Sequence, residues 1–420
     1  MTQHSAVLED EHLTTSDKQP YQFPSHTTAL SRWTDRYDAL CRKYLTQTMR
    51  QPESVIGQFI LPIVCLIMFC ICIGGTPSHL PVAVINEEQP PYLSSILLKK
   101  MNSYILHKIN YTDFDEAVND VKAGKIWGVL HIKPNFSEAI TERVFFADLD
   151  NHTIDQSSVR LYADLTNKVL GITLDVVLVH TFEDFISEAM TEMGYNPNLG
   201  RLPIRLEKTI YGEFSNSDFF GVRDFAAPGF LIVITYSVAY ALTALTLLLE
   251  RLDLMFERNY ASGISTTQII LSILSTRFIF TSLGTVVLLV LGIFLFDVPC
   301  RGPFWGVLLM LLLQSLAGMT MGMVVSAVVP DFFICAAVSN GVLIFIFIIS
   351  GVLWSLETLP YYVRWFSYIQ PTTVPAESLR SLLTRGLGVT HPSVYPGFII
   401  TVIWIIIFFV TSVKIFKFQK

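Results

Sequence analysis

The sequence predicts a mainly α-helical, multi-pass membrane protein that carries one large α/β domain outside the membrane. Of its 420 residues 51% are hydrophobic and only 15% are charged, whereas soluble domains carry about 25% charged residues. The apolar residues are also gathered into runs, each close to the roughly 20 residues with which a helix crosses a bilayer. These six runs lie at about 55–75, 226–249, 278–296, 304–329, 332–353 and 397–413.

The residues before the first run divide into two parts. Residues 1–29 are polar and rich in Ser, Thr, His and acidic groups, so we expect a disordered cytoplasmic N-terminus. Over 30–54 aromatic and apolar residues recur at helical spacing between basic residues, which predicts an amphipathic helix in the inner membrane interface. A helix packed on a soluble partner is the alternative. The first apolar run begins too far along the chain for a visible cleavable signal peptide.

The distribution of basic residues predicts the orientation. Counting from residue 30 on, eleven Lys and Arg lie before the first run, between the second and third, or after the sixth, and four lie in the short loops on the other side. Because basic residues accumulate on the cytoplasmic side, both termini are predicted to be cytoplasmic and segment 76–225 to be extracellular. Three N-x-[ST] sequons, at Asn110, Asn135 and Asn151, all fall in this segment, which predicts glycosylation in a eukaryotic source.

Segment 76–225 has the alternating pattern of an α/β domain. Strand composition is found at 80–86, 125–132 and 143–149, and helical patterns at 92–109, 113–124 and 157–191. Such alternation predicts a small sheet covered by helices. The segment holds no cysteine, so a packed core rather than disulfides must stabilise it. It shows no metal-ligand spacing, and no metal site is predicted.

Residues 226–420 contain the other five runs and a long outer loop at 354–396. Prolines and aromatic residues in this loop predict short helices at the outer membrane interface. Within it, Glu377 and Arg380 are three residues apart and are expected to pair on one helix face.

Several small or polar residues interrupt the apolar runs. Three small residues recur at every fourth position of the fourth run: Gly318, Gly322 and Ser326. Such a stripe predicts close helix packing, either inside the bundle or between subunits. Tyr236 and Tyr240 lie in the second run and Asn340 lies in the fifth. Polar groups at membrane depth are costly, so we expect these to face protein or a cavity.

A short charged segment separates the second and third runs. Over 250–263 the periodicity predicts one amphipathic helix lying under the membrane, which Gly263 ends and a Ser265–Gln268 capping box follows. Its charged face comprises Glu250, Arg251, Asp253, Glu257 and Arg258. Leu254 is an apolar exception in the middle of that face. A solvated loop that obeys the positive-inside rule is the alternative, but acidic residues are as frequent here as arginine.

The sequence lacks the motifs of nucleotide and metal enzymes. It has no G-x-x-x-x-G-K-[ST] phosphate loop, no H-E-x-x-H, no G-x-S-x-G and no paired-cysteine motif. We therefore expect the chain itself to be no enzyme and to bind no cofactor.

Five motifs in order resemble the membrane half of a type-2 ABC (ATP-binding cassette) transporter, over about residues 30–418. They are MRQPE (49–53), VAVINEE (82–88) with DLDN (148–151), Glu250-Arg251 with YASGIS (260–265), SGVLWSLETLP (350–360) and PTTVPAESLR (371–380). The chain is most similar to eukaryotic G and H half-transporters, particularly those of the arthropod H subfamily. Those carry an ATPase domain before the membrane half. Since this sequence begins with Met and a polar stretch, we expect either a separate ATPase subunit or a product without its cassette.

The resemblance implies a mechanism. Two membrane halves would pair, as a homo- or heterodimer, around a cavity lined by the second and fifth spans, where Tyr236, Tyr240 and Asn340 become cavity candidates. ATP and Mg²⁺ would be bound by partner cassette domains, which the charged segment would contact, with Leu254 entering a cleft. Substrates would be lipids or other amphipathic molecules exported across the plasma membrane, and no nucleic acid is involved.

Two other classes of function compete with this one. A non-transporting cell-surface glycoprotein, such as a receptor or adhesion protein, would use the extracellular domain and have no ATPase partner. A secondary transporter would show inverted repeats and carboxylates within the membrane. The sequence has no visible repeat, and Asp and Glu are absent from all six runs.

Overall fold

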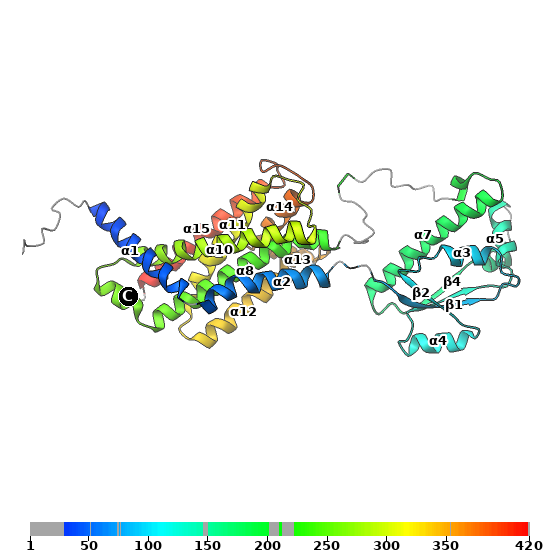
Figure 1. Cartoon of the computed structure of the whole chain (residues 1–420), viewed down its shortest axis with the longest axis horizontal. Helices are drawn as coiled ribbons and strands as arrows, with labels where there is room; N and C mark the ends of the chain where they lie inside the picture. The colour runs from blue at the N-terminus through cyan, green and yellow to red at the C-terminus, as the bar shows by residue number, and fades with distance from the viewer. Residues whose placement is uncertain are drawn as a thin grey trace, which may run out of the picture.

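The computed structural model of the chain describes residues 29–50, 52–73, 75, 77–145, 150–200, 210–211, 222–352 and 354–418. Figure 1 shows two parts, a bundle of long helices and an α/β domain inserted between the helices labelled α2 and α8. The predicted disordered N-terminus, 1–29, falls almost wholly outside the described residues.

Long apolar helices form the bundle. They are α2 (Pro52–Cys72), α8 (Val222–Leu252), α10 (Thr266–Phe296), α11 (Phe304–Val328), α12 (Phe332–Ile349) and α15 (Tyr395–Phe418). Among the described residues, five of these are long and apolar enough to cross a membrane, and the apolar part of α2, Ile56–Cys72, is shorter. Helix α10 begins at Thr266, where the Ser265–Gln268 capping box predicts a helix start, and it continues through the buried Arg277 into the apolar run that begins at 278.

The small-residue stripe of α11 packs inside the bundle, against α8. A Cβ atom on Gly318 would lie 2.3 Å from the carbonyl oxygen of Tyr236, and one on Gly322 would lie 2.4 Å from that of Tyr240. Only glycine permits backbones to approach this closely. Of the two predicted roles for this stripe, packing inside the bundle or between subunits, the structure shows packing inside the bundle.

Helix α12 is bound to the bundle along one narrow stripe. Its buried side chains are Cys335, Ser339 and Ile346, and most of its other apolar side chains are exposed. The Asp331 carboxylate begins the helix by accepting hydrogen bonds from the N–H groups of Phe333 (2.9 Å) and Ile334 (3.0 Å). The exposed face of α12 is thus available to lipid or to another helix.

The N-terminal helix α1 (Ala29–Met49) packs on α10, beside which it lies in Figure 1. Leu40 and Tyr44 are buried in a cluster with residues of α8, α9 and α10, and the Tyr37 hydroxyl donates to Oγ of Ser275 at 2.7 Å. The amphipathic face of α1 therefore contacts this chain's own bundle. Trp33 and Met49 remain exposed.

The α/β domain is built on a four-stranded sheet with the order β2-β1-β3-β4. Its strands are β1 (Leu80–Asn86), β2 (Leu106–Asn110), β3 (Gly128–Ile132) and β4 (Arg160–Ala163). The first three are parallel and β4 is antiparallel to β3. The helices are α3 (Leu93–Lys100), α4 (Phe114–Lys122), α5 (Phe136–Phe145), α6 (Asn151–Gln156) and α7 (Lys168–Glu192). Figure 1 shows α4 below the sheet and α3 and α7 above it. The predicted sheet covered by helices is present.

Three local predictions in this domain are wrong. The helix expected at 157–191 begins only at Lys168, as α7, because residues 160–163 form the strand β4 that pairs with β3. The strand expected at 143–149 is instead the end of α5 as far as Phe145, because Phe136 and Ile140, one helical turn apart, are buried in its core; residues 146–149 lie outside the described part. The helix expected at 92–109 divides into α3 and the edge strand β2. Apolar runs this short do not distinguish helix from strand by periodicity alone.

Short helices complete the outer loop and the linkers. They are the 3-10 turns η1 (Pro197–Gly200) and η2 (Leu356–Thr358), then α13 (Tyr361–Ile369) and α14 (Thr373–Leu383), with α9 (Met255–Ala261) at the other end of the bundle. The short helices predicted for the 354–396 loop are therefore present.

Candidate functional site

The charged segment after α8 is not one continuous helix. Helix α8 continues to Leu252, Leu254 adopts the left-handed conformation (φ 56°), and α9 begins at Met255. The predicted helix over 250–263 is therefore wrong in its first part. A left-handed leucine costs about 1–2 kcal/mol, and the turn places Phe256 in the core, where its ring stacks on Phe416 at 5.5 Å.

Glu250 faces inward, against its assignment to an exposed charged face. It is 3% exposed, and its carboxylate accepts hydrogen bonds from the Tyr44 hydroxyl (3.4 Å) and from Nε2 of Gln47 (3.2 Å). Buried Arg277 of α10 interacts with it electrostatically. Helical periodicity cannot reveal this contact, because the partners on α1 are more than 200 residues away.

Arg251 is also engaged within the chain. Its guanidinium donates to the carbonyl oxygens of Ser326 and Ala327, near the end of α11, and lies 5.8 Å from the ring centre of Phe416. Carbonyl groups at a helix C-terminus lack intrahelical donors and favour a cation. Arg251 therefore anchors the end of α8 to α11, which corrects its assignment to a docking face.

The remaining members of the predicted docking set lie outside. Asp253, Glu257 and Arg258 are exposed, and Leu254 is 53% exposed between them. They belong to the turn before α9 and to its outer face. This segment thus has a buried face fixed by Phe256 and an outer face with three charges around one apolar side chain.

The predicted end of the segment is confirmed. Gly263 has φ +73° and follows Ser262, the residue that caps the C-terminus of α9. The Ser265 hydroxyl accepts a hydrogen bond from the N–H of Gln268 (3.3 Å), whose Oε1 accepts from the N–H of Ser265 (2.9 Å), forming the capping box of α10. Arg36 of α1 donates to the Gly263 carbonyl at 2.6 Å. Both ends of α9 are therefore fixed to other helices.

The three cavity candidates differ in their exposure. Tyr236 and Tyr240 are completely buried with stacked rings, in a cluster formed by α8, α11 and α12. Neither lines an open space, because α11 approaches their backbones through Gly318 and Gly322. Asn340 alone is exposed, on α12.

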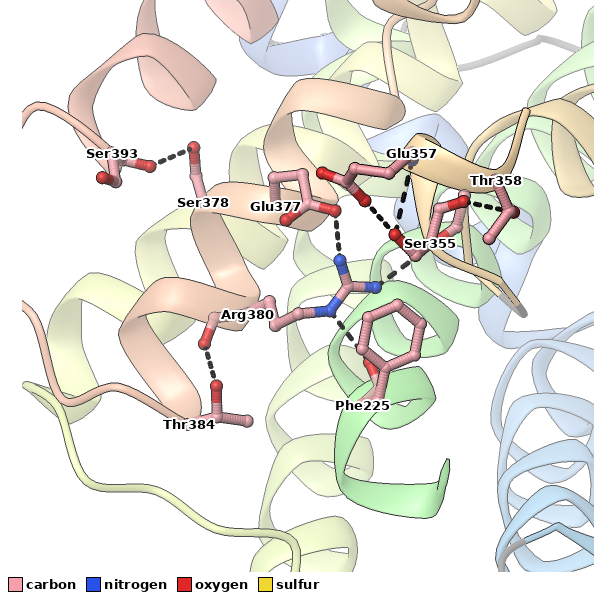
Figure 2. A network of polar contacts seen from close by, with 10 residues as sticks. Phe225, Ser355, Glu357, Thr358, Glu377, Ser378, Arg380, Thr384 and Ser393 are labelled. Atoms are coloured by element: carbon pink, nitrogen blue, oxygen red, sulfur yellow. Dashed lines mark hydrogen bonds and ion pairs between the residues drawn. The ribbon is translucent and has the colours of Figure 1, made fainter. Parts of the chain in front are cut away.

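A buried arginine at the opposite end of the bundle joins three segments (Figure 2). Arg380 of α14 is 5% exposed; its Nε donates to the carbonyl of Phe225 (2.9 Å) and its Nη2 to that of Gly351 (3.3 Å). The predicted pair with Glu377 is confirmed, and the guanidinium carbon lies 3.9 Å from the ring centre of Phe225. Spacing predicted only the contact with Glu377.

Sequence reasoning missed a buried amide between α11 and α15. Gln314 is completely buried, donates to the carbonyl of Pro371 at 3.0 Å and accepts a hydrogen bond from Thr401 at 3.3 Å. An amide within an apolar run was the signal that could have identified it.

The three sequon asparagines all belong to the α/β domain. Asn110, Asn135 and Asn151 are all exposed, so each presents its side chain for modification. Within the described ranges no three His, Cys, Asp or Glu residues form a group that could hold a metal ion.

The chain is similar to known membrane transport proteins over most of its length. Residues 52–414 match the family described as ABC-2 family transporter protein. The chain is 29% identical over 369 residues to ABC transporter G family member 20 of Dictyostelium discoideum, covering 88% of this chain and 49% of that protein. It is 21% identical to G family member 23 of the same organism, covering 90% and 52%, so it spans about half the length of these two relatives. It is 23% identical to the probable multidrug ABC transporter permease YbhS of Escherichia coli K12, covering 84% and 89%.

Proposed function

The chain belongs to the ABC-2 transporter family, and we propose that it is the membrane subunit of an ATP-driven exporter of lipids or other amphipathic molecules. In this role it pairs with a second membrane half and with two ATP-binding cassette domains, which would bind ATP and Mg²⁺. Within the family we place it beside the G and H half-transporters. We further propose that α2 is a sixth span, that the α/β domain is extracellular and that both termini are cytoplasmic, in the plasma membrane.

The outer face of α9 carries the proposal. Leu254 is held exposed in a left-handed conformation between Asp253, Glu257 and Arg258. The turn at Leu254 places Phe256 in the core, but the Leu254 side chain itself remains 53% exposed. An apolar anchor surrounded by charges is instead the usual composition of an interface centre with a polar rim.

The connections of α9 suit the transmission of force. Phe256 fixes it to the core near Phe416, Arg36 of α1 contacts its end at Gly263, and Arg251 joins the preceding turn to α11. A cassette that moves α9 would therefore act on several helices at once. This gives a physical route from ATP binding to the bundle.

Helix α12 supports pairing with a second membrane half. Its outward face is apolar apart from Asn340. An amide facing lipid is costly, and it is better accommodated in a wet cavity or against another helix. Asn340 is accordingly the remaining cavity candidate, while Tyr236 and Tyr240 would act only as packing behind α12.

The test is copurification followed by an ATPase assay. The tagged full chain, expressed in cells of its source and purified in mild detergent, should bring a cassette protein and ATP hydrolysis with it. Leu254→Asp should reduce both by about ten-fold or more, as expected when an interface anchor worth roughly 2 kcal/mol is lost. Leu165→Asp, a substitution at a similarly exposed leucine of the outer domain, should change neither.

Two results would contradict the proposal. If Leu254→Asp retained full substrate-stimulated ATPase activity, α9 would not be the docking surface. If no cassette protein copurified while the chain bound cells through its outer domain, the alternative of a non-transporting surface glycoprotein would be favoured.

A further inference from the structure

The outer domain contains an open groove that the transport proposal does not use. It has a volume of about 900 Å³ and lies between α7, α3 and α5 on one side and strands β3 and β4 on the other. Small-molecule sites occupy about 300–1,000 Å³, so the groove is large enough for a ligand with a long chain.

The walls of the groove are mainly apolar. Its lining includes Leu97, Met101, Leu161, Val179, Phe182 and Ile186. Leu161 and Phe182 are more than one-third exposed and Val179 is 46% exposed. Covering such side chains with an apolar ligand gains about 25 cal/mol for each Å² removed from water.

One end of the groove carries a cation. Arg143, in the last turn of α5, donates to the hydroxyls of Ser157 (3.2 Å) and Ser158 (3.4 Å), and all three residues line the groove. The nearby Asp155 carboxylate is already paired with Lys133 and Arg160. Among the residues that the structure describes, no carboxylate forms an ion pair with Arg143.

Helix α7 brings acidic groups to the lining. These are Asp175 and Glu183, and Glu183 faces His180 at 3.6 Å. An anion is therefore favoured only at the Arg143 end, where the guanidinium is the donor; the Ser157 and Ser158 hydroxyls accept from it and themselves donate to the Ile154 carbonyl. The groove combines a long apolar wall with a single anion-binding end.

We propose that this groove binds a single-chain amphiphile, with its acyl chain along α7 and its carboxylate or phosphate group at Arg143. The occupant follows from the charge complementarity at one end and the apolar lining along the rest. A phosphate head and a carboxylate head share this chemistry, and they can be distinguished by experiment.

The experiment uses the full chain in nanodiscs with a photoactivatable, diazirine-bearing palmitic acid and the matching lysophosphatidic acid. After illumination, labelled peptides are mapped by mass spectrometry. Label is expected on α7 and β4 in addition to any on the membrane helices. Val179→Trp should fill the groove and reduce the outer-domain label several-fold, whereas Ile172→Trp, on an exposed α7 position outside the groove lining, should leave it unchanged.

The head group is tested with Arg143. Arg143→Ala should weaken labelling by either anionic probe about ten-fold, as expected for the loss of a charge-assisted hydrogen bond. Arg143→Lys should recover part of it, and a diazirine-bearing fatty alcohol should label the wild-type chain and the Ala variant equally. A stronger signal from one anionic probe would identify carboxylate or phosphate as the natural head.

Several outcomes would overturn the inference. Label confined to the membrane helices, or outer label unaffected by Val179→Trp, would mean that no amphiphile occupies the groove. Val179→Cys chains that crosslink to one another would show that a second copy covers it instead. The labelling requires neither ATP nor a cassette, so its failure would leave the proposed transport function untouched. Failure of the transport proposal would likewise leave amphiphile binding in the groove untouched.

Discussion

The bundle and the outer domain each use one buried charge to hold two helix ends together, but they use charges of opposite sign. In the bundle, Arg380 donates to the carbonyls of Phe225 and Gly351, and so joins α14 to the start of α8 and the end of α12. In the outer domain, Glu88 accepts from the N–H groups of Tyr92 (3.1 Å), Ser94 (3.2 Å) and Ser137 (2.8 Å) at the starts of α3 and α5.

The contacts of Arg380 and those of Glu88 each form a joint between helix ends, and the two joints differ in their response to pH. The joint at Arg380 is made mainly to backbone carbonyls and to the Phe225 ring, neither of which titrates. Burial alone would raise the pKa of the Glu88 carboxyl, but the hydrogen bonds from Ser137, Ser94 and Tyr92 outweigh it and hold that pKa below its ordinary value of 4.5. The joint in the outer domain can therefore be switched off by acid, while the joint in the bundle cannot.

The largest effect is expected from Arg380→Ala. This change removes an ion pair, two bonds to backbone carbonyls and the contact with the Phe225 ring, and leaves buried acceptors without a donor. Breaking a buried ionic contact from one side costs about 3–5 kcal/mol, measurable as a fall in the thermal unfolding midpoint of the detergent-purified chain.

Matched variants sharpen that result. Arg380→Lys keeps the charge but loses the planar fork, so it should fall between wild type and Arg380→Ala. Arg385→Ala, at an exposed position just beyond α14, should leave the midpoint unchanged. Equal effects at Arg380 and Arg385 would show that the cluster in Figure 2 does not hold the bundle together.

A smaller and pH-dependent effect is expected from Glu88→Gln. Hydrogen bonds to a charged group contribute about 1.5–3 kcal/mol, and this part of the stability is present above the unfolded pKa. Because the folded pKa is lower, the advantage of wild type should be constant near neutral pH, shrink as pH falls below 4.5, and vanish once pH passes the folded pKa.

Hydrogen exchange of the α3 and α5 amides in the full chain, at neutral and at acidic pH, would measure this difference. Glu116→Gln, an exposed substitution on α4, serves as the control and should behave as wild type throughout. A Glu88→Gln deficit that stayed constant down to pH 3 would mean that the carboxylate charge is not what holds the two helices.

Sequence reasoning succeeded where the relevant contacts are local. The capping box at Ser265 and the glycine stop at Gly263 depend on neighbours within three or four residues, and both were predictable. So was the Glu377–Arg380 pair, one turn apart on a single helix. Five of the six predicted spans and the presence of a helix-covered sheet followed from hydropathy and alternation, whereas the strand at 143–149 was wrong and strands β2 and β4 were missed.

The failures share a different physical origin. Glu250 was assigned outward because its helical neighbours are charged, but its partners Tyr44 and Gln47 come from a helix 200 residues earlier. Tyr236 and Tyr240 were expected to face either protein or a cavity, and only the fold shows that both pack against protein, in a cluster with α11 and α12. Likewise, the VAVINEE and PTTVPAESLR motifs were recognisable, yet only the fold shows that each ends in a buried charge that joins distant helix ends.

Another buried charge, Glu250, gives the smallest effect and extends the comparison to the α9 end of the bundle. Its described hydrogen bonds are two long contacts with side chains of α1, and it also interacts with the buried guanidinium of Arg277. Burial and then the charge of Glu250 raise the pKa of Tyr44, so its hydroxyl stays protonated and acts as the donor. Tyr44→Phe keeps the ring in the core and removes only a 3.4 Å contact, so it should cost less than about 0.5 kcal/mol.

Tyr37→Phe provides the matched comparison, because its hydroxyl donates to Ser275 at 2.7 Å from the same helix. It should cost more than Tyr44→Phe in the same unfolding assay, about 1 kcal/mol. That order would mean that α1 is fixed firmly to α10 but only loosely to Glu250 of α8. A Tyr44→Phe cost as large as that of Glu88→Gln would show instead that this end is held as firmly as the other two joints.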